Sequence, residues 1–191
     1  MKKLNLIIAA AGAVCIMQAC NNNSKTAATT DSTTTTADAT KTDTTKMTAA
    51  VPADTADVSF ATQAAAGGMT EIDLSKLELQ SANTKIKDFA NMMVTDHTDA
   101  GNKLMAIAKA KNITLPDGPN AMQQQIISDM SKKSGVVLDK AYVAQMVTDH
   151  KKTIALFEGA QKTVKDTTLK TFITNTLPTL HKHLDAINAI K

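Results

Sequence analysis

The chain is poor in the residues that usually carry chemistry. It has two cysteines, four histidines, one tyrosine and no tryptophan. Both cysteines, Cys15 and Cys20, lie near the N-terminus. The remainder of the chain therefore has no disulfide of its own, no thiolate nucleophile and no cysteine-based zinc site. We expect its folded part to be stabilised by a hydrophobic core alone.

Arginine is absent, so lysine supplies every basic side chain, and the formal net charge is only +3. No lysine cluster alternates with aromatic residues. A nucleic-acid interface normally needs a concentrated basic surface, so we expect no nucleic-acid partner.

Familiar catalytic patterns are missing as well. The chain has three glutamates, Glu71, Glu78 and Glu158, and no Glu-x-x-His sequence. A di-iron carboxylate bundle needs a glutamate from each of two helices and a Glu-x-x-His from each of the other two, which argues against a ferroxidase-type centre. No Ser-His-Asp order or glycine-rich phosphate loop is present, and close packing is favoured for the Gly67-Gly68 pair. We assign no catalytic residue and no organic cofactor, and expect a non-enzymatic role.

Residues 1–20 have the layout of a signal peptide. Lys2 and Lys3 precede an apolar stretch that is short for a membrane span. The run Met-Gln-Ala-Cys ending at Cys20 resembles a bacterial lipobox, which implies lipidation of Cys20; Cys15 is the weaker candidate. The alternative is an ordinary signal peptide with an incidental cysteine. We expect an exported lipoprotein anchored to a membrane, the outer membrane being favoured, on its periplasmic or surface face.

Residues 21–57 are rich in threonine and contain almost nothing to bury, which predicts a disordered tether. Residues 58–191 then form one domain of common size. Apolar residues recur there every three or four positions, which predicts helices at about 58–82, 84–111, 139–161 and 166–190. A shorter amphipathic segment, 122–132, follows a proline- and glycine-containing turn.

No stretch alternates with the period of a strand. The predicted fold is therefore all-α: an up-down four-helix bundle, with a short extra helix in the connection between its second and third helices. Asn83 and Asp166 are expected to cap helix starts. Pro178 is expected to bend or break the last helix, because proline removes a backbone hydrogen bond.

The sequence Met-Val-Thr-Asp-His occurs twice, ending at His97 and at His150. Phe89 and Tyr142 precede the two copies by the same step. Both histidines fall on apolar helix faces, as does His183, whereas His181 should flank its helix or be exposed. The repeat indicates that two helices each contribute a histidine to a common site.

Glu71 lies on the apolar face of the first helix. Counted from the helix ends, Glu71, His97, His150 and His183 fit one layer at mid-bundle, one residue from each helix. A carboxylate and three imidazoles suit one divalent transition metal: zinc, copper, iron or manganese. The alternative is a metal-free network of buried hydrogen bonds.

Nearby residues have open roles at this stage. Asp96 and Asp149 either support the neighbouring histidines or face solvent. Met93 and Met146 would suit copper, but core packing is favoured. Glu78 and Glu158 are further candidate ligands, although a solvated or capping role is favoured for both.

Several segments resemble one bacterial family. They are Ala66 to Glu71, Lys87 to His97, Leu115-Pro116, Tyr142 to His150 and Leu177 to Leu184. The chain is similar to the ferritin-like family of exported proteins called domain of unknown function 4142, often described as outer-membrane proteins. The resemblance implies a ferritin-like bundle in the cell envelope, with characteristic polar positions at Glu71, His97, His150 and His183. It implies no activity.

Two functions follow as expectations. The first is a lipid-anchored envelope bundle that binds one metal ion for sequestration or sensing. The second is a metal-free envelope interaction or stress protein whose glutamate and histidines form a structural network; the sequence identifies no protein partner. A third, an oxidative enzyme, would need an open metal position and a substrate pocket.

Overall fold

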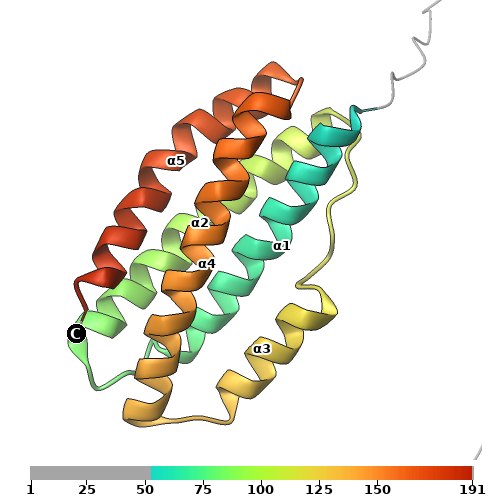
Figure 1. Cartoon of the computed structure of the whole chain (residues 1–191). Helices are drawn as coiled ribbons and strands as arrows, with labels where there is room; N and C mark the ends of the chain where they lie inside the picture. Colours follow the sequence, from blue (N-terminus) through green and yellow to red (C-terminus); the bar gives the residue numbers. More distant parts are fainter. Residues whose placement is uncertain (1–52, 191) are drawn as a thin grey trace, which may run out of the picture. The chain divides into compact units, whose positions relative to one another are not determined.

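A computed structural model describes residues 53–190, which contain five α-helices and no strand (Figure 1). The predicted signal peptide, Cys20 and the tether up to residue 52 lie outside the described residues. The helices are α1 (Thr55–Leu77), α2 (Thr84–Ala110), α3 (Ala121–Ser131), α4 (Gly135–Thr163) and α5 (Thr167–Asn188).

Four of these helices form the bundle. Helices α1 and α5 each pack against both α2 and α4, while α3 lies beside α1 and α4 (Figure 1). The predicted all-α bundle is confirmed, and α3 is the extra helix expected in the connection. None of the helices within residues 53–190 is long and apolar enough to cross a bilayer.

The connection between α2 and α4 runs back along the bundle (Figure 1). At one end, the Ser81 hydroxyl in the α1–α2 turn donates to Asp139 near the start of α4, at 2.8 Å. At the other end, Lys111 after α2 pairs with Asp166 before α5. Helices α2 and α4 therefore run in the same direction, and each packs only against antiparallel neighbours in the bundle. This is the arrangement of ferritin-like bundles with one long crossover.

In an up-down bundle with short connections, the end of the second helix lies next to the start of the third. The predicted layer assumed this arrangement, and the assumption is wrong. The layer still forms because His150 lies near the middle of α4, counted from either end. The error arose because the sequence between 111 and 134 does not reveal how far along the bundle it travels.

Local sequence accounts for most helix ends. The side chains of Asn83 and Asp166 accept hydrogen bonds from backbone N–H groups of the following helix, as predicted, and Asp54 and Asn120 do the same for α1 and α3. Helix α1 spans Thr55–Leu77 rather than about 58–82, and Glu78 occupies its C-cap.

The predicted break at Pro178 is not present, because α5 continues from Thr167 to Asn188. Pro178 and Thr174, four residues earlier, are both exposed. The carbonyl that loses its helical partner at proline therefore faces water, while buried Leu177 and Leu180 hold the helix against the bundle.

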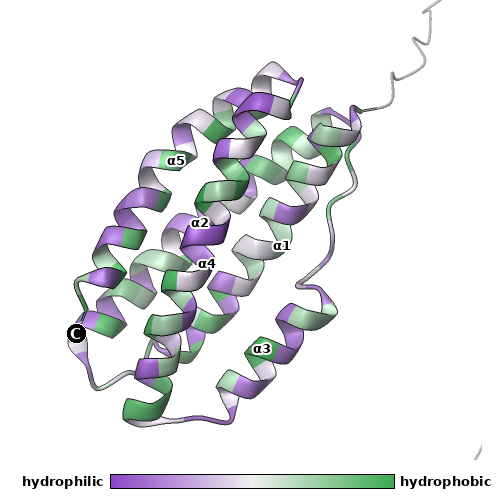
Figure 2. Ribbon diagram, viewed as in Figure 1, coloured by the Kyte–Doolittle hydropathy of each residue, from purple (hydrophilic) through white to green (hydrophobic). Residues whose placement is uncertain are grey.

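Two apolar clusters fill the bundle, and Figure 2 displays apolar segments on every helix. One cluster contains Phe60, Phe157 and Phe172, and the other contains Phe89 and Met146. Buried His97 in α2, His150 in α4 and His183 in α5 each lie between the residues of the two clusters, and on α1 buried Glu71 lies between them together with Ala66 and Thr70. The layer therefore crosses the middle of the core.

Candidate metal centre

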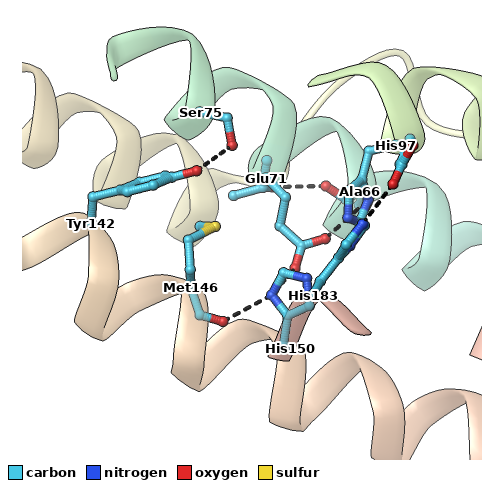
Figure 3. A network of polar contacts seen from close by, with 10 residues as sticks. Ala66, Glu71, Ser75, His97, Tyr142, Met146, His150 and His183 are labelled. Atoms are coloured by element: carbon cyan, nitrogen blue, oxygen red, sulfur yellow. Dashed lines mark hydrogen bonds and ion pairs between the residues drawn. The ribbon is translucent and has the colours of Figure 1, made fainter. Parts of the chain in front are cut away.

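Each bundle helix contributes one polar residue to this layer, and the structure brings all four predicted residues together (Figure 3). Glu71 comes from α1, His97 from α2, His150 from α4 and His183 from α5. Their exposed fractions are 2%, 7%, 0% and 1%, respectively. The four side chains are thus almost completely removed from water. We call this set the polar layer.

The distances in the polar layer are short. One ring nitrogen from each of His97, His150 and His183 can be chosen so that all three lie within 4.8 Å of one another. The Glu71 Oε2 atom lies 3.3 Å from His97 Nδ1, and Oε1 lies 3.5 Å from His150 Nδ1. Two ligand atoms bound at about 2.1 Å to one tetrahedral ion lie about 3.4 Å apart. A contraction of at most about 1.4 Å in these separations would therefore bring the histidines to ligand spacing.

Two of the histidines are oriented by hydrogen bonds on one ring nitrogen. The His150 Nδ1–H donates to the Met146 carbonyl oxygen at 2.9 Å, one helical turn earlier. The His183 Nε2–H donates to Asp96 Oδ2 at 2.8 Å. Such a bond fixes the tautomer of a neutral imidazole and leaves the lone pair of the other nitrogen available, as in many metal-binding histidines.

The two aspartates of the repeated sequence differ in role. Asp96 supports His183, a histidine of another helix. Asp149 instead accepts both hydrogen bonds of the Gln145 side-chain amide, at 2.9 Å each. The repeat therefore produces two equivalent histidines with different surroundings.

Several polar atoms of the layer have no hydrogen-bond partner although they are buried. They are both carboxylate oxygens of Glu71, His97 Nε2, His150 Nε2 and His183 Nδ1. The contacts of Glu71 with His97 and His150 have ion-pair distances but lack hydrogen-bond geometry. Buried polar atoms without partners are rare in folded proteins and each one destabilises the fold. A bound cation would satisfy several of them at once.

Burial controls protonation in the layer. It raises the pKa of Glu71 to about 8, and the nearby Asp149 carboxylate adds to the rise. It lowers the pKa of His97 to about 3, with His183 and His150 adding to the decrease, and the pKa of His150 to about 4. The pKa of His183 is also lowered by burial, against the opposing effect of Asp96. Neutral imidazoles are the form that binds metal ions.

Aromatic rings close one side of the layer. The Phe89 ring lies edge-on to His150 and to His183, with ring centroids 6.4 Å apart in both cases. Tyr142, its counterpart in the repeat, does not contact the histidines in this way. Its hydroxyl shares a 2.8 Å hydrogen bond with Ser75 (Figure 3).

The remaining candidates are outside the layer. His181 is exposed as predicted, and Glu158 is exposed 3.9 Å from it. Met93 and Met146 are completely buried in an apolar cluster, which confirms core packing. Close packing of the glycine pair is not supported, because a Cβ at Gly67 would meet nothing within 4 Å and one at Gly68 would meet only His97 Nδ1, at 3.8 Å.

Glu78 is where the sequence analysis misjudged the surroundings. Glu78 lies at the C-cap of α1, which agrees with the predicted capping role. It is only 1% exposed, however, so it is not solvated, and its Oε1 has no hydrogen-bond partner. Burial raises the pKa of Glu78 to about 7, and the adjacent Asp139 carboxylate adds to the rise. The apolar residues Leu77 and Leu79 on either side were the available signal.

The fold and the layer define a class: four-helix bundles with a buried cluster of histidines and a carboxylate. A family model described as "Domain of unknown function (DUF4142)" matches residues 40–190, and the chain belongs to that family. This confirms the resemblance noted in the sequence.

A solved structure has a similar fold, described as "Crystal structure of DUF305 fragment from Deinococcus radiodurans". The TM-score is 0.65 at 9% sequence identity, and the match covers 73% of this chain and 97% of that chain. At this identity the likeness concerns the fold alone. No curated protein matches the chain at a significant level.

Proposed function

We propose that the polar layer binds one divalent transition-metal ion, with His97, His150 and His183 as imidazole ligands and Glu71 as the carboxylate beside them. The observation that carries this proposal is the convergence of three buried histidines, with ligand atoms within 4.8 Å of one another. A mixed imidazole and carboxylate set suits zinc, copper, iron or manganese.

The unpartnered atoms support the same function. Five nitrogen and oxygen atoms in the layer have no hydrogen-bond partner. A divalent ion offsets this cost by coordinating imidazole lone pairs and neutralising the Glu71 carboxylate. The protein's role is then to sequester or sense the ion. We further propose that lipidated Cys20 anchors the bundle to the outer membrane, so that it meets metal ions in the cell envelope.

A metal-free structural network is the second candidate, and two bonds favour it. The His183–Asp96 and His150–Met146 hydrogen bonds involve only protein atoms, and they fix two rings in place. In that case Glu71 retains a proton, and the layer determines how the four helices align.

Elemental analysis of the full chain, purified without a histidine tag, separates these candidates. We expect about one ion per chain in the wild type and after His181→Ala, and a loss of at least about tenfold in affinity after His150→Ala. The His181→Ala variant is a matched control because His181 is exposed and lies two residues from His183. A wild type without metal, whose melting temperature is unchanged by zinc, copper, iron or manganese, would support the structural network instead.

A further inference from the structure

A cavity of about 520 Å³ adjoins the polar layer, with Glu71, His97 and His183 among its lining residues. Most of the remaining lining is apolar, including Leu104, Phe157, Phe172 and Leu180. Pockets of this size with apolar walls and a few convergent polar groups are typical small-molecule sites. The histidines therefore have a neighbouring space that the metal itself would not fill.

Gly68 keeps part of this space open. It lines the cavity, and a Cβ at this position would meet only His97 Nδ1, at 3.8 Å. Glycine inside a helix is less favourable than alanine, because it loses more conformational freedom on folding. Since no neighbouring atom requires a glycine here, the missing side chain is better explained by the space that it leaves beside His97.

The cavity also reaches the surface. Met105, which is 60% exposed, lines it together with Leu115 and Pro116 from the connection after α2. A molecule from outside can therefore approach the polar layer without unfolding the bundle.

The charged residues that line the cavity restrict which ligands it can bind. No lysine lines the cavity, so an anionic ligand has no opposite charge to meet. Three carboxylates line the cavity: Asp96 is bonded to His183 at 2.8 Å, Asp117 is exposed, and Glu71 is buried without a hydrogen-bond partner. Four buried polar atoms of cavity-lining residues have no hydrogen-bond partner: both oxygens of Glu71, His97 Nε2 and His183 Nδ1. Each belongs to a side chain more than nine-tenths buried.

We propose that this cavity binds a mainly apolar molecule that carries a terminal hydroxyl group and no negative charge. The apolar part lies among Leu104, Phe157 and Phe172, and the hydroxyl donates a hydrogen bond to an unpartnered imidazole nitrogen of the polar layer. This binding site goes beyond the metal function: it belongs to the metal-free protein, since a hydroxyl and a metal ion would compete for the same imidazole nitrogens.

The test uses 1-octanol as the probe, titrated into the untagged, metal-free full chain and followed by calorimetry. We expect saturable binding of 1-octanol, with octanoate at least about tenfold weaker because its negative charge meets no lysine in the lining. Gly68→Leu should weaken 1-octanol binding by roughly tenfold or more, since the new side chain occupies the cavity.

Gly67→Leu is the matched control. It makes the same change one residue earlier on α1, at a position that does not line the cavity, and should leave binding unchanged. If Gly68→Leu does not fold, Ala100→Leu fills the same cavity from α2. The proposal is overturned if 1-octanol does not saturate, if a cavity-filling variant binds as well as the wild type, or if octanoate binds equally tightly. Metal content is measured separately, so this failure would leave the metal proposal intact.

Discussion

Glu71 illustrates how a single residue decides the character of the site. Its carboxylate is 2% exposed, has no hydrogen-bond partner and lies beside two histidines. A buried carboxylate is costly as an ion unless a positive charge accompanies it. Glu71 therefore has two stable forms: protonated in the metal-free protein, or ionised next to a cation.

Glu71→Gln tests this role, because glutamine keeps the shape of the side chain and removes its charge. We expect zinc affinity to fall by about 10- to 100-fold, as for other residues that support metal sites. Isothermal titration with zinc measures the change, with Glu158→Gln as an exposed control. Unchanged zinc affinity in the Glu71 variant would mean that its charge plays no part in binding.

Glu78 should make stability depend on pH. Burial raises the pKa of Glu78 to about 7 from its ordinary value of 4.5, so the folded protein holds a proton that the unfolded chain releases. Its contribution to stability is complete below about pH 4.5 and is lost as the pH rises through about 7. Glu78→Gln should therefore stabilise the protein at pH 8 by roughly 1–3 kcal/mol, and have little effect at pH 4.

Chemical denaturation at both pH values measures this difference. Glu158→Gln again serves as control, because Glu158 is exposed and its replacement should change stability little at either pH. Equal effects of Glu78→Gln at pH 4 and pH 8 would contradict the assignment of a buried, proton-holding carboxylate.

At the residue scale, the sequence predicted the members of the polar layer because each lies on an apolar helix face. It did not predict which partner orients each histidine. Asp96 was one of two equivalent candidates, and only the packing of α2 against α5 selects it. The hydrogen bond from His150 to the Met146 carbonyl could not be predicted either, because every residue has a backbone carbonyl and the sequence does not distinguish this one.

At the scale of elements, α5 contains the clearest local conflict. Pro178 lies within a continuous helix, where proline destabilises by about 3 kcal/mol relative to alanine. Part of that cost is offset because proline also restricts the unfolded chain, by about 0.4–1 kcal/mol. The exposed position of Pro178 lets water solvate the carbonyl that lost its partner.

Pro178→Ala should therefore stabilise the protein by roughly 1–2 kcal/mol without changing the fold. Thermal and chemical denaturation measure the gain, and circular dichroism checks that helix content is retained. A loss of stability would indicate that α5 needs a proline-dependent geometry at this point to place Leu177 and Leu180 in the core.

The number and type of helices followed from sequence periodicity, and so did most of their ends. The relative direction of α2 and α4 did not. It depends on contacts such as Ser81–Asp139 and Lys111–Asp166, which join residues distant in the sequence. The prediction of close packing at Gly67 and Gly68 was also wrong. A Cβ at either position would meet at most one neighbouring atom within 4 Å, which only the packed structure reveals.

At the scale of the whole molecule, the bundle has two apolar clusters with the polar layer between them. Within residues 53–190 there is no cysteine, so the fold depends on these clusters and on the layer that joins them. A metal ion that binds only the folded state would stabilise this arrangement by about 2.7 kcal/mol at a concentration 100-fold above its Kd. The same site would then link metal content to the stability of the bundle.

X-ray absorption spectroscopy of the zinc-loaded full chain, purified without a histidine tag, tests the central claim most directly. It counts the imidazole rings around the ion rather than only detecting that an ion is present. We expect about three imidazole nitrogens at about 2.0–2.1 Å, together with carboxylate oxygen. Zinc surrounded by oxygen alone, with no scattering from imidazole rings, would contradict metal binding by His97, His150 and His183.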